Sequence, residues 1–218
     1  ATGWNNNSKR EITMFDEDGK PFGNYEVEKK KNPELDGWKY IELLAKKLTT
    51  DEMLAAFMKY MMRYVSDKGD DHWQTPDQTV RRLWHNFMIG DCDDLAFLAT
   101  NIRRLQGKPA HVVGIPGHAL CMWAEPRPDG RYNVCTIDTS DFFNKNGNKF
   151  KYPPDKEKER GFKTLEEGAN EVVSEYYIAD PLGVILFSIK IDPKKVEILD
   201  IDYEKKDKDG NFERTTTY

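Results

Sequence analysis

Cys92 is the residue of this sequence whose surroundings best fit covalent catalysis. It lies in the run 90–94 (Gly-Asp-Cys-Asp-Asp), directly before an apolar segment with helical spacing. A thiol at a helix N-terminus faces the positive end of the helix dipole, which favours the thiolate, the form that attacks carbonyl carbon. The dipole contributes only about 0.3–1 kcal/mol, so an imidazolium in contact with the sulfur must supply most of the activation.

His118 and Asp138 are the expected base and its orienting carboxylate. The sequence predicts strands at 118–125 and 132–138, joined by a turn centred on Pro128. In that register His118 faces Asp138 across an antiparallel ladder, where opposed Cβ atoms lie about 4.5–5.5 Å apart. The carboxylate would then hold one imidazole nitrogen and leave the other for the thiol. Cysteine, histidine and aspartate arranged in this way form the catalytic triad of a thiol nucleophile.

Other interpretations of these residues stay open. His111 opens a predicted strand without an opposed acid, and His85 is expected to pack on a helix beside Trp84, so both are interpreted as structural. Cys92 itself could be an inert thiol in a core helix. The glycine before it and the acids around it fit an apolar core poorly, which favours the catalytic interpretation.

The acids that flank the thiol, Asp91, Asp93 and Asp94, would oppose its ionisation unless they are turned away or neutralised. Acidic residues at a helix start are favourable caps, and this is the preferred explanation for them. A bound calcium ion is the alternative, because clustered carboxylates offer the hard oxygen ligands that calcium prefers. The thiol chemistry itself requires no cofactor.

Trp73 and Gln74 lie in the loop before a helix that Thr75 is expected to cap, with Pro76 at its first position. Because this loop shortly precedes the nucleophile helix, it could wall a substrate cleft. Gln74 could also donate a hydrogen bond to an oxyanion, although a lone glutamine beside an N-cap is usually solvated.

Cys121 and Cys135 oppose each other in the register that pairs the triad, on the other face of the sheet. Two buried thiols are favoured over a cross-strand disulfide between them. The three cysteines form no CxxC pair and the chain has no HExxH motif, so neither a structural zinc site nor a zincin mechanism is supported.

The elements that must position these residues come as helices first and strands afterwards, which predicts an α+β fold with the helices packed on a C-terminal antiparallel sheet. The methionine-rich stripe of the second predicted helix is interpreted as core rather than as a binding groove. The predicted helices run over 34–47, from Thr50 through Tyr64, from Pro76 past His85, and from Asp91 to about Leu105. The predicted strands are 111–115, 118–125, 132–138, 171–178, 184–191 and 196–203.

The chain is expected to form one catalytic domain at 31–204. An N-terminal tail with a small hairpin, its strands at 11–15 and 25–27, occupies 1–30, and a polar tail occupies 205–218. A polar excursion at 142–165 is too long for an ordinary connection and is expected to be a surface loop near the site.

Composition excludes some partners. The 218-residue chain has a formal net charge of −5, which argues against a nucleic-acid surface, and no apolar run long enough to span a bilayer. It begins at Ala1 rather than at methionine, which fits removal of a signal, propeptide or tag. The compartment therefore stays open, with a periplasmic or secreted location slightly favoured over a cytoplasmic one. The expected partner is a protein or peptide substrate.

Two motifs and the residues that follow them carry a family resemblance. The chain has Asp-His-Trp-Gln-Thr-Pro at 71–76 and Gly-Asp-Cys-Asp-Asp at 90–94, then a Gly-x-Pro-Ala passage at 107–110 before the strand-opening histidine and the strand-ending aspartate. This order resembles the bacterial transglutaminase-like cysteine proteinases, which carry a pattern similar to Asp-Tyr-Trp-Ala-Thr-Pro followed by Gly-Asp-Cys-Glu-Asp. The resemblance covers about 71–142, roughly a third of the chain.

The resemblance implies a papain-like, transglutaminase-like fold with Cys92 as nucleophile, His118 as base and acid, and Asp138 as the residue that orients it. Some relatives use acids around the cysteine for calcium. Gln74 stands where the family pattern has alanine, so no role is carried over to it. A thiol hydrolase that cleaves a peptide or isopeptide amide is the expected function. Transglutaminase-type acyl transfer to an amine, or a non-catalytic binding domain on the same fold, are the alternatives.

Overall fold

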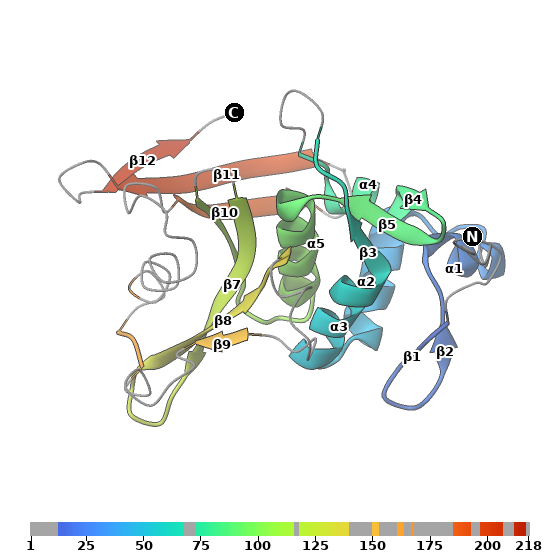
Figure 1. Cartoon of the computed structure of the whole chain (residues 1–218), viewed down its shortest axis with the longest axis horizontal. Coiled ribbons are helices and arrows are strands. Elements are labelled where there is room, and N and C mark those ends of the chain that lie inside the picture. The colour runs from blue at the N-terminus through green and yellow to red at the C-terminus, as the bar shows by residue number, and fades with distance from the viewer. Residues whose placement is uncertain are drawn as a thin grey trace, which may run out of the picture.

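The computed structural model describes residues 13–67, 73–115, 118–139, 150–152, 161–163, 167, 185–192, 197–206 and 212–216. In these ranges the helices precede the strands of the largest sheet, as Figure 1 shows, and the predicted α+β class is confirmed. The helices are α1 (Tyr25–Lys31), α2 (Gly37–Lys47), α3 (Asp51–Met61), α4 (Pro76–Arg81) and α5 (Cys92–Leu105).

The largest sheet has the strand order β12-β11-β10-β6-β7-β8-β9, and its neighbouring strands are antiparallel. A small sheet of order β3-β5-β4 and the β1–β2 hairpin lie outside it. The strands are β1 (Met14–Phe15), β2 (Pro21–Phe22), β3 (Met62–Tyr64), β4 (Leu83–Trp84), β5 (Phe87–Gly90), β6 (His111–Ile115), β7 (His118–Pro126), β8 (Tyr132–Ile137), β9 (Phe150–Tyr152), β10 (Ile185–Asp192), β11 (Glu197–Lys206) and β12 (Phe212–Thr216).

Helix caps lie where the sequence predicts them. Thr50 accepts a hydrogen bond from the backbone N–H of Met53, and Thr75 accepts one from that of Gln78. The Gln78 side chain in turn accepts from the Thr75 N–H, which completes a capping box, and Pro76 takes the first helical position. These side chains satisfy N–H groups that a helix start leaves without intrahelical partners.

The N-terminal hairpin is confirmed, but its second strand is β2 rather than 25–27. Tyr25 instead begins α1, because the side chain of Asn24 accepts from the Val27 N–H and acidic residues occupy the first turn. The asparagine cap and the acidic first turn favour a helix here more strongly than the three residues 25–27 favour a strand.

The third helix is shorter than the sequence predicts. It ends at Arg81, and β4 and β5 follow as a hairpin whose turn residues, His85 and Asn86, have φ of 47° and 70°. Two consecutive positive φ values are typical of a tight hairpin turn, which asparagine tolerates. His85 is therefore exposed rather than packed on a helix, and Trp84 is 58% exposed.

Helix α5 forms the centre of the core. Figure 1 shows it between β7 of the large sheet and the helices α2 and α3. Leu95, Leu98 and Ile102 recur at helical spacing and are fully buried. The second predicted helix, α3, also faces the core: Met58 and Met61 are buried, as expected. Tyr64 lies beyond the end of this helix, in β3.

The predictions for the C-terminal third of the chain are tested only in part, because many of its residues lie outside the described ranges. The strand at 171–178 and most of the loop at 142–165 lie outside the described residues. Within that loop, β9 pairs with β8, and Phe162 forms a bridge with Tyr132. The strand β12 falls in the segment assigned to a polar tail and pairs with β11. Across the described ranges, no helix has both the length and the apolar character needed to cross a membrane.

Candidate active site

Cys92 is the first residue of α5 and is half-buried. The strand β5 ends at Gly90, directly before Asp91, the N-cap. A Cβ at Gly90 would lie 2.5 Å from Asp94 Oδ2 and 2.9 Å from Met62 Cε, so this close approach leaves no room for a side chain. The glycine thus lets a strand pass directly into the helix that presents the thiol.

His118 joins the thiol to a carboxylate. Its Nε2 lies 2.7 Å from Asp138 Oδ1, and the Cys92 side chain is close enough to the ring to raise the pKa of His118. Because Nε2 faces Asp138, Nδ1 is the nitrogen left for the sulfur. The hydroxyl of Thr139 donates to the same Asp138 oxygen at 3.3 Å. The three predicted catalytic residues therefore come together as a connected chain of contacts.

The register that brings them together differs from the predicted one. Cys121 pairs with Ile137, not with Cys135, so the β7–β8 ladder is displaced by two residues. Asp138 is consequently diagonal to His118 rather than directly opposite, a separation that long side chains still bridge. The displacement keeps both residues on the face that the sequence predicts, because side chains alternate with a period of two.

The β7–β8 turn causes this displacement. The backbone N–H of Arg127 donates to the Arg131 carbonyl at 2.8 Å, and Gly130 donates to the Arg127 carbonyl. Three residues therefore lie inside the loop, with Gly130 at φ 76°, and the centre falls on Asp129 instead of Pro128. A type I turn followed by a left-handed glycine is a common three-residue hairpin connection.

The charge environment favours an imidazolium at His118. Burial by itself lowers the pKa of the ring, but hydrogen bonds to Asp138 and Cys92 and the charges of both groups raise the pKa to about 9. A protonated ring held between a carboxylate and a thiol matches the imidazolium–thiolate pair that makes a cysteine nucleophilic at neutral pH.

The other candidate base, His111, and the other two thiols, Cys121 and Cys135, are poorly placed for catalysis. His111 pairs with Met122 on the β6–β7 ladder, several residues away from the pair that includes His118, and burial together with Arg104 lowers its pKa. Cys121 is fully buried, which raises the pKa of its thiol to about 11. Cys121 and Cys135 are buried and no disulfide joins them, as the sequence favours, so the described residues offer Cys92 as the accessible thiol.

Gln74 is buried, which contradicts the expectation of a solvated side chain. Its backbone N–H donates to Asp94 Oδ1 at 3.0 Å, and its side-chain amide donates to Asp94 Oδ2. The backbone N–H of Asp91 donates to the same Oδ2 at 3.1 Å. The carboxylate of Asp94 thus works as an internal acceptor, although burial raises its pKa.

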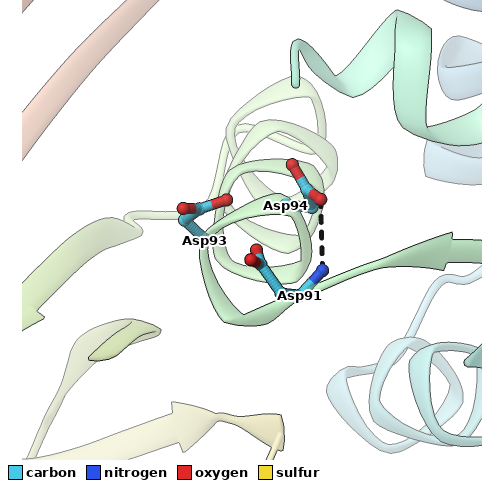
Figure 2. A group of neighbouring side chains, drawn as sticks. All are labelled: Asp91, Asp93 and Asp94. Atoms are coloured by element: carbon cyan, nitrogen blue, oxygen red, sulfur yellow. Dashed lines mark hydrogen bonds between the residues drawn. The ribbon is translucent and has the colours of Figure 1, made fainter. Parts of the chain in front are cut away.

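The three acids near Cys92 differ in how their carboxylate oxygens are satisfied. Figure 2 shows Asp91, Asp93 and Asp94 around the first turn of α5, and ligand atoms of all three lie within 4.8 Å of one another. Asp94 accepts the hydrogen bonds just described, whereas Asp91 Oδ1 is buried without a hydrogen-bond partner among the described residues. An orphaned carboxylate oxygen fits a hard cation, so Asp91 and its neighbour Asp93 fit calcium better than Asp94 does.

Trp73 and Tyr64 lie near the nucleophile. The half-buried Trp73 packs edge-on against Phe97, with ring centroids 5.5 Å apart. Tyr64 pairs with Gly90 across β3 and β5 and is 51% exposed. Burial, and the charges of Cys92 and the acids beside it, raise the pKa of Tyr64. Sequence reasoning missed Tyr64 because it was counted in the second helix, and no motif marks it.

Comparisons of the chain with models of protein families, with curated proteins and with solved structures find no match.

Proposed function

We propose that this chain is a thiol-dependent hydrolase that cleaves a peptide or isopeptide amide on a papain-like, transglutaminase-like fold. One observation carries the proposal: His118 Nε2 lies 2.7 Å from Asp138 Oδ1, and the Cys92 side chain lies close enough to the same ring to raise its pKa. A base that contacts a nucleophile and is itself oriented by a third group is the arrangement that acyl transfer requires.

The reaction follows from this contact. The Cys92 sulfur attacks the amide carbon, and the carbonyl electrons move to oxygen as the carbon–sulfur bond forms. The first N–H groups of α5, which have no intrahelical partners, can stabilise the resulting oxyanion. His118 then protonates the leaving amine as the carbon–nitrogen bond breaks, leaving a thioester. Water, deprotonated by the same imidazole, releases the acid and restores the thiol.

Acyl transfer to an amine is the second candidate, because an amine can release the same Cys92 thioester in place of water. Incubation with a glutamine-containing donor and a labelled primary amine separates the two reactions. Incorporation of label supports transfer, whereas release of ammonia or of peptide without incorporation supports hydrolysis.

We further propose that Asp91 and Asp93 can hold calcium. The ion would supply positive charge that neutralises acids next to the thiolate, and the chemistry at sulfur would stay with Cys92 and His118. Calcium should raise the melting temperature of the full chain, and Asp91→Asn should reduce that rise. An equal melting temperature with calcium and with a chelator would refute this role.

The test of the hydrolase proposal needs no substrate. Iodoacetamide labelling followed by intact mass, over a range of pH, measures the reactivity of Cys92. We expect one rapid alkylation at a pH below that at which a free thiol reacts, lost in Cys92→Ser and slowed in His118→Ala. Labelling of Cys92 at the rate of an ordinary thiol in the wild-type protein would overturn the proposal and leave a binding domain.

A further inference from the structure

Gln74 is one of three positions at which this chain departs from the motifs it otherwise resembles, and the structure gives its side chain a partner. Backbone and side chain of Gln74 both donate to the carboxylate of Asp94. Gln74 is 3% exposed and Asp94 is fully buried. An alanine could make only the backbone contact, so the amide adds a second, charge-assisted bond that fixes the orientation of the loop.

The partner of Gln74 belongs to the nucleophile's own helix turn. Asp94 lies two residues after Cys92, and its Oδ2 also accepts the N–H of Asp91 at 3.1 Å. One carboxylate therefore ties together the loop at 73–75 and the turn that presents the sulfur. Displacement of either segment would break hydrogen bonds to a buried charge, which is costly.

The residue that this contact holds in place is Trp73. Its indole packs against Phe97 and an apolar cluster that includes Ala96 and Ala119. Ala96 is one helical turn beyond Cys92 on the same face of α5, and Ala119 follows His118 on β7. The indole thus lies against the two elements that carry the nucleophile and the base.

We propose that Gln74 is a positioning residue: it holds Trp73 beside Cys92 as an apolar surface for a substrate side chain next to the scissile amide. This inference rests on the proposed hydrolase function and names its substrate class, peptides with an aromatic or large apolar residue there. The described hydrogen bonds of Gln74 go to Asp94 and not to Cys92, so its loss should weaken substrate binding more than it changes the reactivity of the sulfur.

Two thiol-directed probes separate these effects on the full chain. Iodoacetamide reports the sulfur alone, whereas benzyloxycarbonyl-Ala-Phe fluoromethyl ketone must also place the phenylalanine next to its reactive ketone on the protein. In the second case sulfur attacks the methylene carbon and fluoride leaves. For Gln74→Ala we expect the rate constant of the peptidyl probe to fall by up to about tenfold, the limit reached if the net free energy of one hydrogen bond is used to hold Trp73 in place, and that of iodoacetamide to change less. Trp73→Leu should likewise lower the ratio of the rate constant of the peptidyl probe to that of iodoacetamide.

Gln106→Ala is the matched control. Gln106 lies just past the other end of α5 and donates from its side chain to the carbonyls of Ala45 and Leu48. Its loss should lower the melting temperature comparably and leave the ratio of the two rate constants unchanged.

Three results would overturn the inference alone while iodoacetamide still labels Cys92 selectively. These are an unchanged ratio in Gln74→Ala, an equal fall in Gln106→Ala, or no reaction of the wild type with the peptidyl probe. Absence of selective iodoacetamide labelling would instead overturn the proposed function, and this inference with it.

Discussion

Asp138→Asn tests the triad most directly, because it keeps the shape of the side chain and removes the charge that faces His118. The pKa of His118 is about 9, against an ordinary value of 6.5, although burial lowers it. This rise corresponds to about 3 kcal/mol in favour of the imidazolium. Asp138 contributes more to it than Cys92 does. We therefore expect Asp138→Asn to bring the pKa toward or below its ordinary value, and Cys92→Ser to lower it by a smaller amount.

Proton NMR measures this directly, because the chain contains only four histidines. The His118→Gln spectrum assigns the resonance, and a pH titration of each variant gives its midpoint. Thr139→Val is the control: it removes the hydroxyl that donates to Asp138 at 3.3 Å but keeps the carboxylate, so the midpoint should move little. A wild-type His118 that titrates near its ordinary value, or a midpoint unchanged in Asp138→Asn, would refute the reasoning.

The same contact makes stability depend on pH with a definite sign. The folded-state pKa of His118 lies above the unfolded value, so the stabilisation is fully present below about pH 6.5 and is lost as the pH rises to about 9. Its maximum is about 3 kcal/mol. Urea unfolding of the wild type and of His118→Gln should show a difference in free energy of unfolding that shrinks over this window. A difference that stays constant with pH would contradict the shift.

Three further perturbations have outcomes that the packing fixes. Gly90→Ala should lower the free energy of unfolding by about 1–3 kcal/mol, measured by urea titration, because the added Cβ would overlap Asp94 Oδ2 at 2.5 Å; an unaffected stability would show that the turn can relax. Arg103→Met should cost about 3 kcal/mol or more in the same assay, because the buried guanidinium pairs with Asp51 and lies 3.6 Å from the centroid of the Trp123 ring. An aromatic disulfide reagent should react with a single thiol in the native protein and with three after denaturation, because Cys121 and Cys135 are buried; a second native thiol that reacts rapidly would refute that burial.

Much of the fold could be predicted from local signals. Thr50 and Thr75 cap their helices through side-chain hydrogen bonds that depend on neighbouring residues only. The start of α5 could be predicted for the same reason, since Asp91 and an apolar periodic segment adjoin Cys92. Whether a segment forms a helix or a strand can be predicted where a capping residue, a terminating Gly or Pro and the spacing of apolar residues agree.

The errors arise where a distant contact or a turn conformation decides. The amide of Gln74 is buried because Asp94, twenty residues away, accepts from it, and nothing in the local sequence reports that partner. Tyr64 continues the apolar stripe of the preceding helix, yet it lies in β3 and pairs with Gly90 of the parallel neighbour β5. Propensity and periodicity carry no information about such pairings, which tertiary packing settles.

His118 and Asp138 are in contact although the predicted register is wrong, and the reason is physical. The β7–β8 ladder is displaced by two residues, an even number, so His118 and Asp138 keep the same face of the sheet and remain within reach of each other. A displacement of one residue would have put the carboxylate on the opposite face and left the imidazole without it. Which face of the sheet each residue occupies therefore depends on the parity of the register, because side-chain direction alternates with a period of two along a strand. The Pro128–Gly130 turn then selects among the registers of that parity, and the length of the two side chains absorbs the difference.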